Sequence, residues 1–307
     1  MQKIPHIPVL YREVIDIVKD IKDGIIIDCT LGYGGHSSMI LESCSDAKLI
    51  GIDQDITAIE FSTKRLEPFK QRVDIKKGRF SKVINEVITE YNIADIKVVL
   101  ADIGVSSLQL DEKKRGFSFD SENLDMRMDK DSPLSASEVI NEYSKSELER
   151  ILLEYGELRN YKKIVLSIIE GRPFNSAKDL SDYLKPHLPK GKKINPATLL
   201  MQAIRIEVND ELGELKKLLE SIKNAKFKNA KIAIISFHSL EDRIVKQTFA
   251  SWAKSCICPA EIMRCTCGNN HSLGKIITKK PITAQEDELQ KNPRSRSAKL
   301  RIFEMKL

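Results

Sequence analysis

Three aspartates, Asp28, Asp53 and Asp102, each end a short apolar run of the kind that forms a buried strand. In an open α/β sheet, ligands bind outside the carboxyl ends of the strands, so side chains at these positions can meet in one site. Carboxylates there can accept hydrogen bonds from ribose hydroxyls or an ammonium group, and one beside a reacting amine can orient that amine. The pattern predicts a ligand site at this edge of a sheet.

A glycine-rich loop, Thr30–Ser37, follows the first aspartate and leads into a helical segment. Glycines let a ligand approach the main chain closely, and the free N–H groups of a helix start face such a ligand. The loop departs from the dinucleotide fingerprint Gly-x-Gly-x-x-Gly, because Ser37 stands at the third glycine position and His36 precedes it. We therefore favour S-adenosylmethionine, which carries an ammonium and a ribose but no phosphate. A plain strand-to-helix connection is the alternative.

Asp53 follows the glycines by about 20 residues, the separation at which an acid can bind both hydroxyls of a ribose. Asp102 is expected beside the reacting methyl group, where a hydrogen-bond acceptor can orient an attacking exocyclic amine. A carboxylate with an ordinary pKa of ~3.9 is a weak base, so orientation is the expected role. Phe80 follows the third expected strand and is a candidate at the same sheet edge. The alternatives are an Asp53 that caps the next helix, a Phe80 that packs in the core, and an Asp102 that only structures its loop.

Alternating strands and helices position these residues. Repeated strand–helix–strand units predict an α/β fold with a parallel, doubly wound sheet. The expected strands are 25–28, 49–53, 73–76 and 98–102, and the expected helices between them are 37–44, 57–70 and 81–91.

The alternation stops after Asp102, and helical periodicity dominates until the next strand. We expect helices at 135–155, 161–170 and 176–184, one long helix at 196–222, and strands at 231–236 and 298–304. This pattern indicates a helical domain inserted into the sheet domain. The expected boundaries are 1–108 and 206–307 for the two parts of the sheet domain and 109–205 for the insertion.

The composition of the 307 residues, 41% hydrophobic and 31% charged, is that of an ordinary globular protein. No apolar run approaches the ~20 residues that span a bilayer, and the first residues resemble no targeting segment, so we expect a cytosolic protein without a membrane partner. Most of the net charge of +6 lies in 291–307, which holds six basic residues and one acid. This end suits a polyanion partner, or it is a solvated tail.

Two loops beyond Asp102, 115–120 and 124–129, mix Arg, Phe and Met. Such loops could enclose an unstacked base, or they could simply pack the inserted domain. His238 follows the fifth expected strand, where it could face a substrate or belong to a helix start.

Four of the six cysteines form two Cys-x-Cys pairs, Cys256 with Cys258 and Cys265 with Cys267. The usual zinc spacing is Cys-x₂-Cys, so the sequence favours a reduced loop and no metal. A four-thiolate zinc site, with His271 as a further possible ligand, is the alternative. Disulfides are not expected in a cytosolic chain.

Taken in order, the motifs of the chain resemble those of the bacterial small-subunit (16S) ribosomal RNA cytosine-N4 methyltransferases of the RsmH (MraW) type. The matching segments are His6–Leu10, Thr30–Ser37, Ile52–Asp55, Gly78–Ser81, Asp102–Asp111, Arg115–Phe119, Leu124–Asp129, Tyr155–Glu157, Gln202–Ile206, Val208–Asn209, Ser236–Arg243 and Asn292–Ser297. Ala101 and Leu158 depart from the family pattern, and neither belongs to the expected cofactor set.

The resemblance implies a class I S-adenosylmethionine-dependent methyltransferase, Rossmann-like in its sheet, that acts on the N4 amine of a cytidine in the decoding region of 16S ribosomal RNA. Its partner would be this RNA, alone or within the 30S subunit. The residues that it implies for the cofactor are Gly34, Gly35, His36, Asp53, Phe80, Asp102 and Gln109. The alternatives are a non-catalytic RNA-binding assembly factor on the same scaffold and a nicotinamide oxidoreductase, which Ser37 disfavours.

Overall fold

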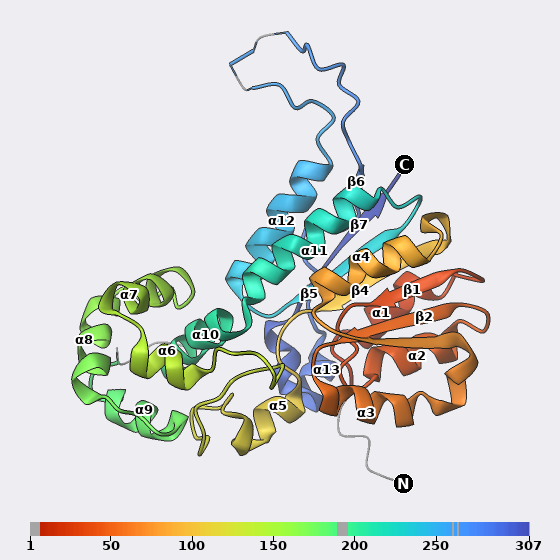
Figure 1. The fold of residues 1–307 in the computed structure, drawn as a ribbon. Helices are drawn as coiled ribbons and strands as arrows, with labels where there is room; N and C mark the ends of the chain where they lie inside the picture. The colour runs from red at the N-terminus through yellow and green to blue at the C-terminus, as the bar shows by residue number, and fades with distance from the viewer. Residues whose placement is uncertain (1–6, 189–195, 260, 263, 307) are drawn as a thin grey trace. The chain divides into compact units, whose positions relative to one another are not determined.

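The structure is a computed structural model that describes residues 7–188, 196–259, 261–262 and 264–306 (Figure 1). The chain divides into two units. The sheet unit contains the residues up to Gly104 and those from Gly213 onward, and the inserted unit is Val105–Leu212. None of the described helices is long and apolar enough to cross a membrane.

The sheet unit is built on seven strands in the order β3-β2-β1-β4-β5-β7-β6. They are β1 (Ile25–Asp28), β2 (Lys48–Asp53), β3 (Val73–Lys77), β4 (Ile96–Asp102), β5 (Lys231–Ser236), β6 (Gly274–Ile276) and β7 (Lys299–Met305). Strands β1 to β5 pair in parallel, whereas β7 is antiparallel to both β5 and β6. The predicted α/β class with a doubly wound sheet is confirmed. The strand order reverses between β1 and β4, which is where such sheets bind ligands.

Side chains that alternate along each strand fill two apolar cores. In β1, Ile27 packs into the core on one face and Ile26 into the core on the other. Helices cover both faces in Figure 1. One face carries α4 (Phe80–Glu90), α11 (Glu211–Ala225) and α12 (Ser239–Trp252), and the other carries α1 (Tyr11–Val18), α2 (Gly35–Ser43) and α3 (Ile56–Arg65). A short helix, α13 (Glu286–Lys291), precedes β7.

The inserted unit has a helical core of its own. Its helices are α5 (Ser107–Asp111), α6 (Ala136–Glu142), α7 (Lys145–Glu154), α8 (Tyr161–Gly171), α9 (Ala177–Leu184) and α10 (Pro196–Asn209). Apolar side chains from five of them, including Val139, Ile151, Ile164, Leu180 and Ile204, are fully buried in one cluster. The segment therefore packs around a second hydrophobic centre rather than forming a loop of the sheet unit.

Several expected elements are divided in the structure. The long helix expected at 196–222 is two helices, because Asp210 adopts a φ of 50° between α10 and α11. The helix expected at 135–155 is interrupted where Ser144 caps α7 in a capping box with Glu147. The helix expected at 57–70 ends at Arg65, and a 3₁₀ turn containing Pro68 follows it.

Candidate active site

The glycine-rich loop is held by the aspartate that ends β1. Asp28 is 1% exposed, and its carboxylate accepts hydrogen bonds from Ser37 Oγ at 2.6 Å and from Thr30 N at 3.1 Å. These bonds tie the strand end to the first turn of α2. Burial raises the pKa of Asp28, while the hydrogen bond from Ser37 lowers it. Asp28 thus fixes the conformation of the loop as a buried hydrogen-bond acceptor.

Glycine is required in this loop by backbone conformation and by close packing. Gly34 caps α2 with a φ of 71°, a region that other residues rarely adopt. Gly35 has an ordinary φ, but a Cβ on it would lie 2.8 Å from Pro8 Cγ. The loop therefore follows a path that a side chain would obstruct.

Asp53, at the end of β2, links the loop to the turn that follows its own strand. Its Oδ2 accepts a hydrogen bond from Gly32 N at 2.7 Å, and its Oδ1 accepts one from Asp55 N at 2.8 Å. Burial raises the pKa of Asp53 to about 6, although both of these hydrogen bonds lower it. Each carboxylate oxygen has a second lone pair, so Asp53 can still accept two ribose hydroxyls.

His36 and Asp102 face each other next to the loop. His36 Nε2 lies 2.8 Å from Val9 O, which requires a proton on Nε2, and His36 Nδ1 lies 3.8 Å from Asp102 Oδ2. Asp102 N donates a hydrogen bond to Thr30 Oγ1 at 2.7 Å. Burial raises the pKa of Asp102 to about 6, and the neighbouring His36 opposes this shift. Asp102 therefore lies next to the glycine loop, and the hydrogen bond to Thr30 fixes the backbone of Asp102.

One oxygen of Asp102 distinguishes this carboxylate from those of Asp28 and Asp53. Among the residues that the structure describes, Asp102 Oδ1 is buried and has no hydrogen-bond partner. Such an atom is costly unless a ligand supplies a donor. A ligand that carries an ammonium, an amine or ribose hydroxyls would suit this site. Asp102 Oδ1 and the carboxylate of Asp53 would accept its hydrogen bonds, and the glycine loop would let it approach the backbone. S-adenosylmethionine fits these residues.

The remaining residues of the expected cofactor set differ in position. Phe80 begins α4 just after β3, and it packs against the core next to the site. Gln109 lies in α5 of the inserted unit, where its side chain accepts a hydrogen bond from Ser106 N at 2.9 Å. The structure therefore brings Gly34, Gly35, His36, Asp53, Phe80 and Asp102 together at one sheet edge, whereas Gln109 has a capping role in the other unit. His6 of the first motif lies outside the described residues.

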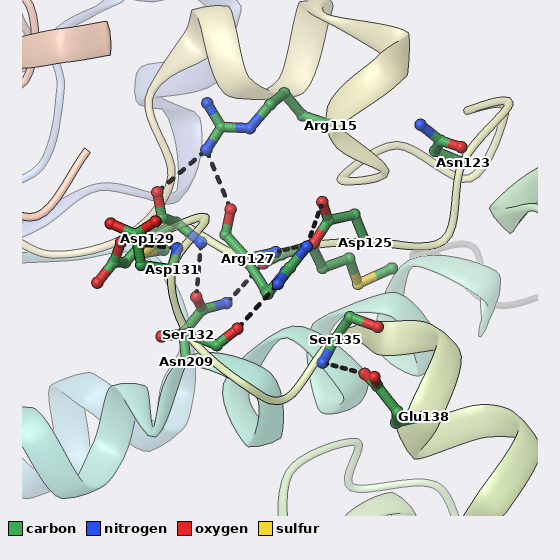
Figure 2. Close-up of polar contacts among 12 residues, drawn as sticks. Arg115, Asn123, Asp125, Arg127, Asp129, Asp131, Ser132, Ser135, Glu138 and Asn209 are labelled. Carbon is green, nitrogen blue, oxygen red and sulfur yellow. Dashed lines mark hydrogen bonds and ion pairs between the residues drawn. The ribbon is translucent and has the colours of Figure 1, made fainter. Parts of the chain in front are cut away.

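Figure 2 shows the loop 124–129 of the inserted unit, for which the sequence left two roles open. Arg115 Nη2 donates to the carbonyls of Arg127 and Met128 at 3.0 and 3.1 Å. Arg127 Nε donates to Asp125 Oδ1 at 2.6 Å, and Asn209 Oδ1 accepts from Met128 N at 2.9 Å. Both arginines thus bind the loop itself.

The apolar side chains of the same loop are internal. Leu124, Met126 and Met128 are 5%, 0% and 8% exposed and belong to the core of the inserted unit. Packing within that unit is therefore the role that the structure shows for them. Phe119 differs, because 46% of it is exposed.

His238 is part of a helix start. It caps α12 in a capping box, in which Glu241 Oε2 accepts hydrogen bonds from Phe237 N at 2.8 Å and from His238 N at 3.2 Å. Glu241 is fully buried, and its charge contributes to the raised pKa of Asp102. Sequence spacing gave no signal for this influence, nor for the contact between Thr30 and Asp102, because the partners lie far apart in the chain.

Comparison with known proteins gives matches along the whole chain. The MraW methylase family matches residues 3–306. The "Ribosomal RNA small subunit methyltransferase H" of Sulfurimonas denitrificans is 69% identical over 306 residues, covering 100% of both chains. The protein of the same name from Nitratiruptor sp. is 58% identical over 302 residues, covering 98% of this chain and 99% of its own. Among solved structures, an rRNA methylase from Streptococcus thermophilus aligns with a TM-score of 0.38 at 10% identity, covering 95% of this chain and 93% of that one.

Proposed function

The chain belongs to the MraW methylase family, and from this premise we propose that it transfers a methyl group from S-adenosylmethionine to the N4 amine of a cytidine in the decoding region of 16S ribosomal RNA. The family expected from the motifs is confirmed by the match over residues 3–306. The observation that carries the proposed chemistry is the buried, unpartnered oxygen of Asp102 beside the glycine loop.

The cofactor supplies an activated methyl group, and the residues of the sheet edge hold it in place. Asp53 accepts hydrogen bonds from the two ribose hydroxyls. The glycine loop, shaped by Asp28, lets the methionine part of the cofactor approach the backbone. His36 and Phe80 border the same space. This assignment rests on residues that converge at the ends of β1 to β4.

Asp102 orients the cytidine amine and removes its proton. The lone pair of an exocyclic amine is delocalised into the ring, and an acceptor for one N–H bond helps to localise it toward the methyl group. Asp102 Oδ1 is the available acceptor. With a pKa of about 6 it is largely ionised at neutral pH, and it is a stronger base than an ordinary carboxylate. The proton released by N4 passes to this oxygen and then to solvent.

Phe119 is the residue that we assign to RNA contact in the inserted unit. It is an exposed aromatic side chain, and aromatic rings stack with unpaired bases. Its neighbour Ser118 is held by a hydrogen bond from Ser118 Oγ to Asp120 Oδ1 at 2.6 Å, which fixes the loop around it. We expect Phe119→Ala to raise KM for RNA and to leave the affinity for S-adenosylhomocysteine unchanged. An unchanged KM would contradict this role.

The reaction is tested by mapping methylated cytidines on 16S ribosomal RNA from cells with and without the gene, and from cells that carry only the Asp102→Asn variant. We expect N4 methylation at a decoding-region cytidine to disappear in the last two strains. Transfer of labelled methyl groups in vitro to free 16S ribosomal RNA and to 30S subunits from the deletion strain then identifies the substrate form. Unchanged methylation in the deletion strain would refute the proposed substrate. Full activity of the Asp102→Asn variant would refute only the role of that residue.

A further inference from the structure

A long segment of the sheet unit, between α12 and β6, contains the four clustered cysteines. It extends away from the body of this unit in Figure 1. Its two arms are joined at the base, where Leu273 N donates to Trp252 O at 2.8 Å and His271 N donates to Ser255 O at 3.0 Å. The described residues of 254–273 contain no helix or strand. Loops longer than about 12–15 residues without such structure are uncommon, and they are usually either functional or linker segments.

The four thiols of this loop meet at its centre, although the pairs come from opposite arms. Cys265 Sγ lies 3.6 Å from both Cys256 Sγ and Cys267 Sγ, and Cys267 Sγ lies 3.7 Å from Cys256 Sγ. With Cys258 included, all four sulfur atoms lie within 4.8 Å of one another. All four are free cysteines. The short Cys-x-Cys spacing therefore does not prevent convergence.

These separations match a tetrahedral metal site. Zinc binds thiolates at about 2.3 Å, so the edges of a regular four-sulfur tetrahedron around it measure roughly 3.8 Å. The observed 3.6–3.7 Å between three of the sulfurs is close to this value. Three of the four sulfurs thus already have the spacing that a zinc ion requires, and Cys258 Sγ lies within 4.8 Å of them.

Backbone N–H groups donate hydrogen bonds to two of the four sulfur atoms. Ile257 N donates to Cys267 Sγ at 3.4 Å, and Thr266 N donates to Cys258 Sγ at 3.3 Å. Each donor follows a cysteine on one arm and reaches a cysteine on the other. Hydrogen bonds of this kind orient metal ligands and stabilise their charge. His271 is oriented differently, because its Nε2 lies 2.8 Å from Cys267 O, so the four thiolates form the ligand set without it.

Hydrophobic burial does not explain the cluster. Cys265 is exposed and the other three are only half-buried. Two large apolar side chains among the described residues of the loop, Ile257 and Ile262, are 61% and 42% exposed. None of the four cysteines belongs to an apolar cluster of the described residues, so hydrophobic packing gives little reason for their contact. A bound ion would supply the missing attraction, as in small domains that depend on zinc.

We propose that Cys256, Cys258, Cys265 and Cys267 bind one zinc ion with a structural role. Four protein ligands close the coordination sphere, which is typical of structural rather than catalytic zinc. On binding, four S–H bonds are replaced by four Zn–S bonds and up to four protons pass to solvent, with no change of oxidation state. The ion joins the two arms of the loop. This inference does not depend on the methyl transfer reaction.

The test measures the metal content of the full-length protein, purified without chelators or added metal. We expect one zinc ion per chain, and an apoprotein that takes up Co²⁺ with the intense sulfur-to-metal and visible bands of tetrahedral thiolate coordination. In the variants Cys256→Ser and Cys267→Ser, the zinc content should fall close to zero. Cys44→Ser is the matched control, because Cys44 lies in the core of the sheet unit, and it should retain one zinc ion.

Circular dichroism of each variant shows whether loss of zinc is confined to the loop. A folded wild-type chain that is free of zinc and shows only weak, octahedral Co²⁺ bands would overturn the proposal. It would also be overturned by zinc that remains bound when all four cysteines of the loop are replaced. Alkylation and mass spectrometry provide the last check, because a disulfide among these cysteines in freshly purified wild-type protein would contradict the thiolate site.

Discussion

Asp102 is a half-buried carboxylate, 23% exposed, with little support from the folded chain when no ligand is bound. Its Oδ1 has no partner among the described residues, and its pKa is raised to about 6. The charged form therefore costs stability at neutral pH, by up to roughly 3 kcal/mol for a shift of this size. We expect Asp102→Asn to raise the thermal midpoint of the ligand-free protein while it abolishes methyl transfer. Differential scanning calorimetry at neutral pH measures the first effect.

A matched control for this variant is Asp20→Asn, which removes the same charge from an exposed position. It should change the midpoint by less than a degree or so, because exposed charges contribute little. If Asp102→Asn proved less stable than the wild type, the carboxylate would have a structural role that its contacts do not show.

The two carboxyls with raised pKa values predict a pH dependence of cofactor binding. Asp53 and Asp102 both titrate at about 6, and only their ionised forms accept hydrogen bonds at both oxygens. Affinity for S-adenosylhomocysteine should therefore weaken as the pH falls from about 8 to about 5. Isothermal titration calorimetry measures this change, and Asp53→Asn should bind weakly with a flatter profile. An identical profile in that variant would exclude Asp53 as the titrating group.

The raised pKa values of Asp53 and Asp102 also make folding stability depend on pH, in the opposite direction to cofactor binding. A raised pKa means that the folded state binds the proton more tightly than the unfolded state does. The contribution of these two groups to stability is therefore complete below about pH 4 and is lost as the pH rises through about 6. The ligand-free site is most stable where it binds the cofactor least.

At the scale of elements, Arg72 fixes the end of the helix that carries the glycine loop. Its Nη1 donates to Cys44 O at 2.6 Å and to Ala47 O at 3.0 Å, and its Nη2 donates to Leu41 O at 2.9 Å. A lysine keeps the positive charge, but its ammonium cannot replace the planar guanidinium that binds these three carbonyls. We expect Arg72→Lys to lower the free energy of unfolding by roughly 1–3 kcal/mol, as measured by urea denaturation.

Arg12→Lys provides the comparison for this variant. Arg12 is an exposed arginine that pairs with Asp287 at 2.7 Å, and such surface pairs contribute little. The two substitutions change the same chemical group, so a difference between them reports on the carbonyls at the end of α2. Equal effects of the two substitutions would mean that the guanidinium of Arg72 is not needed for stability.

The elements that form the site could be predicted because their signal is local. Apolar runs that end in Asp28, Asp53 and Asp102 identify parallel strands and their carboxyl ends at once. The break at Asp210 had no such signal, because the apolar stripe continues from Val208 to Leu212 across it. A positive φ depends on local backbone energetics that helical periodicity does not measure.

Pairings between distant segments could not be predicted in the same way. The sequence indicated a last strand, but not that β7 runs antiparallel between β5 and β6. The pairing of His36 with Asp102 depends on how the glycine loop folds over the strand ends. The spacing of the two Cys-x-Cys pairs likewise favours a loop without metal, whereas the arrangement of their sulfurs depends on the closure of a long loop.

At the scale of the whole molecule, the basic residues near the end of the chain have two different roles. Arg301 lies in β7 and donates to Asp242 at 2.6 Å, so it stabilises the fold and is not part of a solvated tail. Lys291 and Arg296 are exposed. We expect the double variant Lys291→Gln, Arg296→Gln to bind a 16S ribosomal RNA fragment more weakly. Its log–log salt slope should be shallower by roughly 0.7 for each lost phosphate contact.

The control for this experiment is the double variant Lys64→Gln, Lys82→Gln, which removes two exposed lysines from α3 and α4. It reduces the net charge equally, so a purely general electrostatic effect would change both slopes alike. Affinity measured by fluorescence anisotropy at several salt concentrations distinguishes the two results. Equal slopes would place the RNA elsewhere on the chain.

The position of β7 has a consequence for the synthesis of this protein. The inserted unit, Val105–Leu212, is continuous, so all of its residues leave the ribosome long before the sheet unit is complete. The sheet cannot be completed before β7 is synthesised. This is because β6 pairs with β7 and with no other described strand, and β7 also covers the edge of β5. A chain truncated before Lys299 would leave β5 as an open edge, which invites aggregation. A chain with β7 therefore protects this edge of the sheet, and a chain without it does not.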